Sequence, residues 1–347
     1  MKVLLATRKG LIIYKYKKSW ELEKSHFDGV NVTYVNVDEN TNQIWAGLKH
    51  GHWGPKLHQS SNSGKSFQEI SIPKFPEGKI SLKGFWAFSS DSKGRLYLGT
   101  EPAELFHSDD EGKTWELNQS LHMIHGKDKW FPGASEAPCL HSILINPQNI
   151  SNILLGVSVG GVIETQDRGK SWRYRAKGLN ATFMPDPETE IGQDPHLIYR
   201  AKSNSSIIWQ QNHCGIFKSI NGGESWIDLS KSKGVKASFG WAVVCDPKNE
   251  NIAYTVPALS DETRIPFQKK LFVQKTTNGG KSWSVLNKGL PQKNCYDIVY
   301  RHSLDLHENH LVFGTTTGHV YFSKNEGKTW ARIPEFLPPI YALKIIV

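Results

Sequence analysis

Three histidines stand where the strand pattern of the chain can bring their side chains together. His141 and His196 each open an apolar run typical of a β-strand, and His213 follows the next such run after His196. Neutral imidazole is the commonest protein ligand for zinc, manganese, iron or copper, and Gln211 or Glu101 can complete an oxygen and nitrogen ligand set. The pattern predicts a divalent metal ion held by the three imidazoles. The alternative is that each imidazole only hydrogen-bonds to nearby backbone.

Further candidate residues come from distant parts of the chain. Arg264, in a long loop, offers a fixed positive charge for a carboxylate and joins His141, His196 and His213 in the predicted catalytic set. A small anionic or carbohydrate-like ligand is expected. The residues expected to bind it lie at strand starts or in strand-connecting loops: Gln211, Trp86, Trp241, Arg8 and Asp297.

A repeated eight-residue segment positions these candidates, and it is the strongest internal pattern of the chain. Its form is S/T-x-D/N-x-G-x-S/T-W/F, called the turn motif below. It occurs at residues 60–67, 108–115, 165–172, 219–226, 276–283 and 323–330. The Asp or Asn can accept hydrogen bonds from nearby N–H groups, and the Gly supplies a backbone angle that a Cβ would resist. Because the final aromatic residue is expected to be buried between sheets, Asp109, Asp110 and Asp167 are interpreted as structural carboxylates and not as catalytic ones.

Strand-like runs around each motif indicate four-stranded blades. Six motifs give six blades, and a seventh is split between the ends of the chain, because residues 3–14 match residues 311–322 but lack a first strand that residues 339–347 can supply. The sequence predicts an all-β fold with a single domain at 1–347. This domain is a seven-bladed β-propeller with four antiparallel strands per blade, its first blade closed by the N- and C-terminal strands. The blades are expected at 1–25 with 338–347, 30–72, 84–118, 140–176, 196–230, 239–288 and 296–334.

Composition and charge exclude several classes of protein. Hydrophobic residues make up 38% of the chain and charged residues 22%, which favours a packed core over disorder. No apolar run approaches the roughly 18–20 residues that cross a bilayer, and the short apolar start does not match a signal sequence. The net charge of +9 is spread along the chain, so neither nucleic acid nor a membrane is expected as a partner. A cytoplasmic location is expected.

The entire chain resembles a bacterial and archaeal family of Asp-box propellers, also described as BNR-repeat, sialidase-like or glycosyl hydrolase proteins. Besides the turn motifs, which look like Asp-boxes, the resemblance is carried by QQNHCG at 210–215, QDPH at 193–196, FG at 239–240 and FGTTTG at 313–318. True sialidases have six blades, an Arg triad, a Tyr/Glu nucleophile pair and an Arg-Ile-Pro segment ahead of the first box. Here Arg264-Ile-Pro266 lies in the sixth blade, so sialidase activity is not expected.

Two functions remain open. In the first, the protein is a metal-assisted hydrolase or lyase that acts at the mouth of the central channel on an anionic or sugar-like substrate. Seven-bladed lyases of acidic sugars, which place several His and a Gln around a metal, provide an analogy. In the second, the protein is a non-enzymatic binding or assembly propeller with a protein partner, similar to Asp-box factors that assist photosystem assembly. A metal held by three His would favour the first function, and a channel filled with side chains the second.

Overall fold

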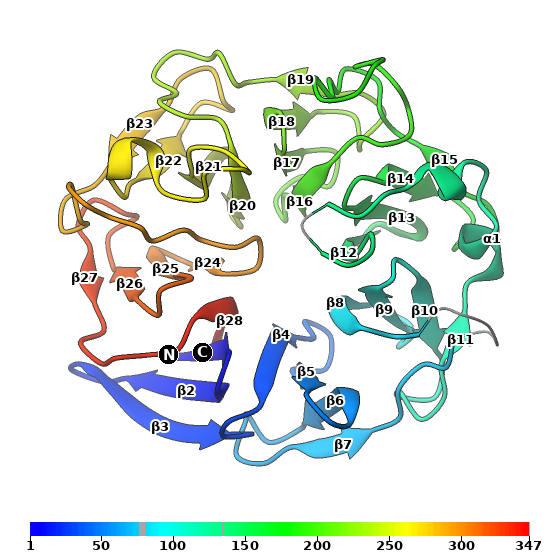
Figure 1. Cartoon of the computed structure of the whole chain (residues 1–347), viewed down its shortest axis with the longest axis horizontal. Coiled ribbons are helices and arrows are strands. Elements are labelled where there is room, and N and C mark those ends of the chain that lie inside the picture. The colour runs from blue at the N-terminus through cyan, green and yellow to red at the C-terminus, as the bar shows by residue number, and fades with distance from the viewer. Residues whose placement is uncertain (76–80, 134, 347) are drawn as a thin grey trace.

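The computed structural model describes residues 1–75, 81–133 and 135–346. Within these ranges the strands form seven antiparallel sheets of four strands each. The sheets stand as blades around one axis, with one strand of each blade nearest the centre (Figure 1). This arrangement is the seven-bladed β-propeller predicted from the sequence.

Blades 2 to 7 are each continuous in sequence, and their strands run outward from the axis in chain order. Blade 2 holds β4 (Asn31–Val37), β5 (Ile44–His50), β6 (Gly54–Ser60) and β7 (Gln68–Ile70); blade 3 holds β8 (Gly84–Ser90), β9 (Leu96–Glu101), β10 (Leu105–Ser108) and β11 (Glu116–Leu117); blade 4 holds β12 (Leu140–Asn146), β13 (Asn149–Val157), β14 (Gly161–Thr165) and β15 (Arg173–Tyr174). Blade 5 holds β16 (Pro195–Arg200), β17 (Ile208–Asn212), β18 (Gly215–Ser219) and β19 (Ile227–Asp228); blade 6 holds β20 (Gly240–Asp246), β21 (Asn249–Pro257), β22 (Val273–Thr276) and β23 (Ser284–Leu286); blade 7 holds β24 (Leu304–His307), β25 (His310–Gly314), β26 (Val320–Ser323) and β27 (Ala331–Arg332).

Blade 1 joins the two ends of the chain, as the sequence predicts. Its strand order is β28 (Ile340–Ile346), β1 (Lys2–Thr7), β2 (Gly10–Tyr16) and β3 (Trp20–His26), with β28 innermost. The antiparallel register of β1 and β28 pairs Leu5 with Leu343. The two termini therefore lie side by side, and the ring has no open sheet edge between its first and last strands (Figure 1).

The six turn motifs adopt the same hydrogen-bonded turn. In each, the first hydroxyl accepts a hydrogen bond from the Gly N–H at 2.8–3.0 Å. The Asp or Asn Oδ1 accepts another from the N–H of the seventh residue at 2.9–3.1 Å. Asp110 and Asp167 are thus used by their turns. The rings that end three of the motifs are buried between blades: Trp226, Trp283 and Trp330.

The apolar core is distributed between neighbouring blades and is not concentrated at the axis. For example, Trp45 of blade 2 stacks on Phe88 of blade 3, with ring centroids 4.2 Å apart. The helical turns α1 (Gln119–His122), η1 (Lys127–Lys129) and η2 (Phe267–Lys269) lie in the segments that connect strands. Among the described residues, no helix is long and apolar enough to cross a membrane.

Candidate functional site

The innermost strands of six blades share a β-bulge near their first residues. Two residues of the inner strand there oppose one residue of the second strand, which re-aims the extra side chain. The bulges contain one equivalent residue per blade: Thr33, Trp86, His141, His196, Trp241 and Tyr341. All of these except His141 line one cavity at the centre of the ring. The repeated bulge therefore determines which side chains face the channel.

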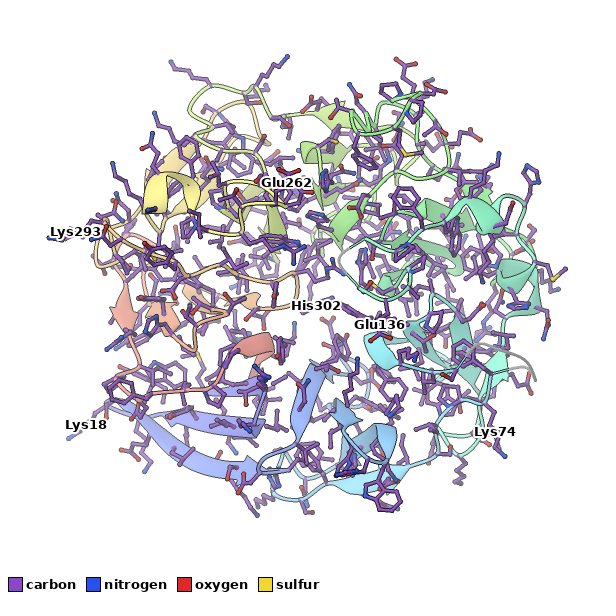
Figure 2. The ribbon with its side chains drawn as sticks, in the orientation of Figure 1. Lys18, Lys74, Glu136, Glu262, Lys293 and His302 are labelled. Carbon is purple, nitrogen blue, oxygen red and sulfur yellow. The ribbon has the colours of Figure 1, made fainter. Side chains whose placement is uncertain are left out.

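His302 occupies the equivalent place in blade 7. Ser142, which follows the bulge residue His141, pairs with Gly156, and Ser303 accepts a hydrogen bond from Gly314 N–H in the same manner. His302 precedes Ser303, and it lies near the centre of the ring in Figure 2. It lines the cavity, although the sequence predicted no place for it there. The sequence signal for this position is the Gly of the second strand, which lies opposite the residue after the bulge. Blade 7 also has this Gly, at the end of the segment VFG at 312–314.

The cavity has a volume of about 590 Å³, and all seven blades contribute to its lining. This size suits a drug-sized or sugar-sized ligand. Its aromatic residues are Phe85, Trp86, Phe131, Phe183, Trp241, Tyr300 and Tyr341. Its charged residues are Lys49, Lys83, Arg264, Arg301, Glu101, Asp194 and Asp261. Phe131 and Phe183 come from the connections before blades 4 and 5, which thus also contribute to the cavity lining.

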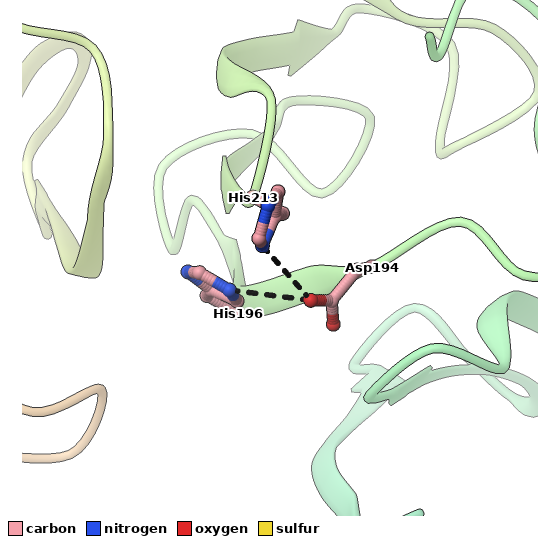
Figure 3. Close-up of side chains that lie close together, drawn as sticks. All are labelled: Asp194, His196 and His213. Atoms are coloured by element: carbon pink, nitrogen blue, oxygen red, sulfur yellow. Dashed lines mark ion pairs between the residues drawn. The ribbon is translucent and has the colours of Figure 1, made fainter. Parts of the chain in front are cut away.

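Asp194, His196 and His213 bring three ligand-type atoms together in the cavity wall. One atom of each lies within 4.8 Å of the other two. Asp194 Oδ2 is 3.3 Å from His196 Nε2 and 3.4 Å from His213 Nδ1, and both imidazoles point toward this carboxylate (Figure 3). Asp194 precedes β16, His196 is its bulge residue, and His213 lies in the turn from β17 to β18. The His213 N–H donates to Asp194 O at 2.9 Å, which fixes this turn beside the strand start.

Hydrogen bonds to backbone orient these side chains. His196 Nδ1 lies 2.6 Å from Gly240 O, and because a carbonyl only accepts, Nδ1 carries the hydrogen. In a neutral ring Nε2 is then an acceptor that faces Asp194 Oδ2, another acceptor. Asp194 Oδ1 accepts from Val159 N–H at 3.1 Å. Two facing acceptors are stable together only with a proton or a cation between them, so this donor set fits a divalent metal ion.

The electrostatics favour an ionised carboxylate at this place. Burial alone would raise the pKa of Asp194, but the charges and hydrogen bonds of His196 and His213 outweigh it and hold the pKa far below its usual value. Burial likewise opposes protonation of His213, yet Asp194 and Asp261 raise its pKa. Asp261 Oδ2 lies 3.8 Å from His213 Nε2. Asp194 thus keeps its negative charge although its side chain is buried.

Trp241 and Arg264 flank this group on the blade 6 side. The Trp241 ring stacks on the His196 imidazole with centroids 5.7 Å apart and an interplanar angle of 12°. Arg264 Cζ lies 5.8 Å above the Trp241 ring, and its Nε donates to Asp261 O at 2.9 Å. The exposed Arg264 therefore lies at the rim of the cavity beside the imidazoles, where the sequence placed it.

Trp86, Glu101 and Arg301 form another part of the wall. Trp86 Nε1 donates to Glu101 Oε2 at 2.9 Å, and Arg301 Cζ lies 5.0 Å from the centroid of the Trp86 ring. Arg301 Nη1 donates to Cys139 Sγ at 3.3 Å. Arg301 lies in the segment before β24 of blade 7 and contacts Trp86 of blade 3 and Cys139, which precedes blade 4, so it joins blades that are not neighbours in the ring. The sequence predicted no role for Arg301, because its neighbours come from distant blades.

His141 lies outside the metal-type group, contrary to the set expected from the sequence. Its side chain is fully buried, with Nε2 2.7 Å from Pro195 O and Nδ1 2.9 Å from Ser142 Oγ. Both ring nitrogens are therefore already hydrogen-bonded. Asp194, two residues before His196, takes the place assigned to His141. The sequence signal for Asp194 is its spacing in the segment Gln193-Asp-Pro-His196: it lies two residues before His196, and residues two apart on a strand share a face.

Gln211, Arg8 and Asp297 are not among the residues that line the cavity, although the sequence analysis placed them with the substrate. Gln211 is buried, and its Nε2 donates to Ser238 O at 2.7 Å. Arg8 is exposed in the turn after β1. Asp297 is buried, accepts hydrogen bonds from Thr315 and Thr317, and lies 2.9 Å from His319 Nδ1. The polar atoms of Gln211 and Asp297 are thus used to hold loops and strands together.

Comparison with known proteins supports the fold class. No protein-family model matches the sequence, and the comparison with curated proteins finds no relative. Among solved structures, the chain is similar to the GH74 enzyme of Niastella koreensis, with a TM-score of 0.55 and 13% identity over 89% of this chain. It spans only 60% of the length of that enzyme.

Two further structures resemble the chain over most of their length. YCF48 bound to D1 peptide has a TM-score of 0.55 and 13% identity, over 88% of this chain and 84% of that one. A 6-phosphogluconolactonase-like protein from Bacteroides fragilis has a TM-score of 0.61 and 10% identity, over 100% and 98%. Likenesses at such identities show the fold alone. The protein is thus a seven-bladed β-propeller whose central cavity holds an Asp–His–His group.

Proposed function

We propose that the protein is a metal-assisted hydrolase or lyase that acts on a small anionic or sugar-like substrate in the central cavity. The observation that carries this proposal is the convergence of Asp194, His196 and His213, with ligand-type atoms within 4.8 Å of one another. Two imidazoles and one carboxylate leave coordination positions open for water or substrate. His141, predicted as a ligand, is not included because both its nitrogens are hydrogen-bonded.

The roles of the chain's own residues follow from their contacts. A divalent ion held by the three side chains would supply an acidified water or polarise a substrate oxygen. Gly240 O fixes the tautomer of His196, and the Trp241 ring shields one face of that imidazole from water. Asp261, beside His213 at the rim, is placed to accept a proton from the substrate side. Arg264 attracts an anionic substrate to the channel mouth.

Elemental analysis of untagged protein tests this proposal. The native protein is expected to carry about one equivalent of a transition metal, and His196→Ala is expected to weaken metal affinity at least tenfold, as loss of one of three protein ligands should. His125→Ala, which removes an exposed imidazole away from the cavity, is the matched control and should keep wild-type metal content. Metal-free wild-type protein that also takes up no zinc or manganese when titrated would contradict the proposal.

A non-enzymatic binding propeller is the second candidate. It is favoured by the likeness to YCF48 bound to D1 peptide, which covers 84% of that chain. In this case the cavity and its rim would receive a segment of a protein partner. The same metal titration separates the two candidates. A protein that takes up no metal, and whose binding of the partner segment is unaffected by His196→Ala, is expected only of the second candidate.

A further inference from the structure

Arg301 carries a positive charge into the cavity without a carboxylate to balance it. The side chain is half-buried, and among the residues that the structure describes no carboxylate lies within ion-pair distance of it. Its contacts are the Trp86 ring and the Cys139 thiol, both neutral groups. A charge removed from water normally has a charged or fully hydrogen-bonded partner. The guanidinium is therefore able to pair with an anionic group of a molecule that enters the cavity.

Among the described residues, the groups next to Arg301 form no ion pair with it. Burial, followed by the charge of Arg301, lowers the pKa of His302 to about 3, and the same two causes hold the pKa of His141 well below its usual value. Both imidazoles are therefore neutral at physiological pH. Glu101 lies in the same wall and forms no ion pair with Arg301; one of its oxygens accepts from Trp86 Nε1. This bond fixes the Trp86 ring under the guanidinium, so Trp86 and Glu101 position Arg301.

Aromatic rings of blades 6, 7 and 1 form the adjacent wall. The Trp241 and Tyr300 centroids are 6.2 Å apart at an angle of 88°, and Tyr300 stacks on Tyr341 at 6.2 Å and 14°. Such rings offer apolar faces to the C–H groups of a sugar ring. The Asp194, His196 and His213 group lies next to this wall, since Trp241 stacks on His196.

We propose that the cavity recognises a sugar acid, with Arg301 binding its carboxylate and the Trp241, Tyr300 and Tyr341 rings contacting its sugar ring. This assignment rests on the proposed function in one respect: the bond of the sugar acid that reacts is placed on the side of Asp194, His196 and His213. The planar guanidinium matches a carboxylate with two parallel hydrogen bonds.

Matched pairs of acid and neutral sugars test the assignment. Glucuronate and galacturonate, each against glucose and galactose, are titrated into the wild-type protein by calorimetry. The acids are expected to bind at least tenfold more tightly than the neutral sugars. Arg301→Gln should abolish this preference without weakening the neutral sugars, and Arg301→Lys should restore it in part, because the charge returns without the planar fork.

Arg332→Gln is the matched control, since Arg332 is exposed on β27 and does not line the cavity. It should keep the preference for the acids. The assignment is overturned if the wild-type protein binds the acids no better than the neutral sugars, or if Arg301→Gln and Arg301→Lys, both folded by circular dichroism, retain the full preference. Zinc titration of the same samples tests the metal proposal separately. If the protein binds no zinc but prefers the acids in a manner that depends on Arg301, the sugar-acid assignment is supported and only the metal proposal is contradicted.

Discussion

The role of a single residue in this propeller depends on whether its polar atoms are already hydrogen-bonded within the protein. His141 and His196 are equivalent bulge residues of adjacent blades, yet their surroundings differ. His141 Nε2 faces Pro195 O and its Nδ1 faces Ser142 Oγ, so the ring joins two blades. His196 uses only Nδ1 in this way and turns Nε2 toward Asp194. From residue type and position in the repeat, both imidazoles were predicted to be metal ligands. Only their contacts in the structure distinguish the two.

Substitution of His141 is therefore expected to affect stability and not metal binding. His141→Ala leaves Pro195 O unpaired in a buried place and should lower the free energy of unfolding by about 1–3 kcal/mol. Urea unfolding measures this loss, and zinc titration of the folded variant should give an affinity within about threefold of wild type. If His141→Ala instead weakens zinc binding as much as His196→Ala does, the ligand set assigned here from the contacts is incorrect.

His302 makes stability depend on pH. Its pKa is about 3, against an ordinary value of about 6.5. Between these two pH values the unfolded chain therefore binds a proton at His302 that the folded protein does not bind. Stability therefore falls as the pH falls below about 6.5, by at most about 2 kcal/mol between pH 6.5 and 5. His302→Gln, which cannot titrate, should reduce this loss in urea unfolding at pH 7 and pH 5. The exposed control His125→Gln should leave it unchanged.

Elements were predicted more completely than the site, for a physical reason. Each turn motif combines a hydroxyl, an Asp or Asn, a Gly and an aromatic ring over eight residues, so its hydrogen bonds are local and its sequence signal is strong. The bulges involve two strands and one extra residue, and they have no comparable local signal. As a result Asp297 was expected at the start of the blade 7 inner strand, whereas His302 occupies the bulge position. Arg301 depends on contacts between blades 7, 3 and 4, which no single segment encodes.

The aromatic ring of a turn motif is expected to stabilise the blade without affecting the cavity. Trp226 is 4% exposed, and its Nε1 donates to Arg175 O at 2.9 Å. Trp226→Ala should lower the free energy of unfolding by about 3–5 kcal/mol, as large core truncations do. Trp53, 74% exposed, is the matched control, and Trp53→Ala should change stability by less than about 0.5 kcal/mol. Folded Trp226→Ala protein should bind zinc and uronate like wild type, and a selective loss of either would place the motif in the site.

The whole molecule depends on a closure that joins the first and last strands. β28 is the innermost strand of blade 1, and it brings Tyr341 and the buried Ile340 and Leu343 to the ring from the end of the chain. Tyr341 also belongs to the aromatic wall of the cavity. Closure and ligand site are thus physically linked: the same strand that completes the sheet completes the cavity.

Ending the chain at Pro338 tests this closure. Loss of Ile340 and Leu343 alone should cost about 2–5 kcal/mol each, and the unpaired edge of β1 should promote aggregation, so soluble expression or the melting temperature should fall sharply. A circular permutant is the control: residue 346 is joined to residue 1 by a short Gly-rich linker, and the chain is opened between Lys231 and Ser232, in the connection between blades 5 and 6. Because β1 and β28 are already paired, this permutant should fold and melt near the wild-type temperature. If the truncated chain is as stable as the wild type, β28 contributes nothing to the ring and the closure is wrong.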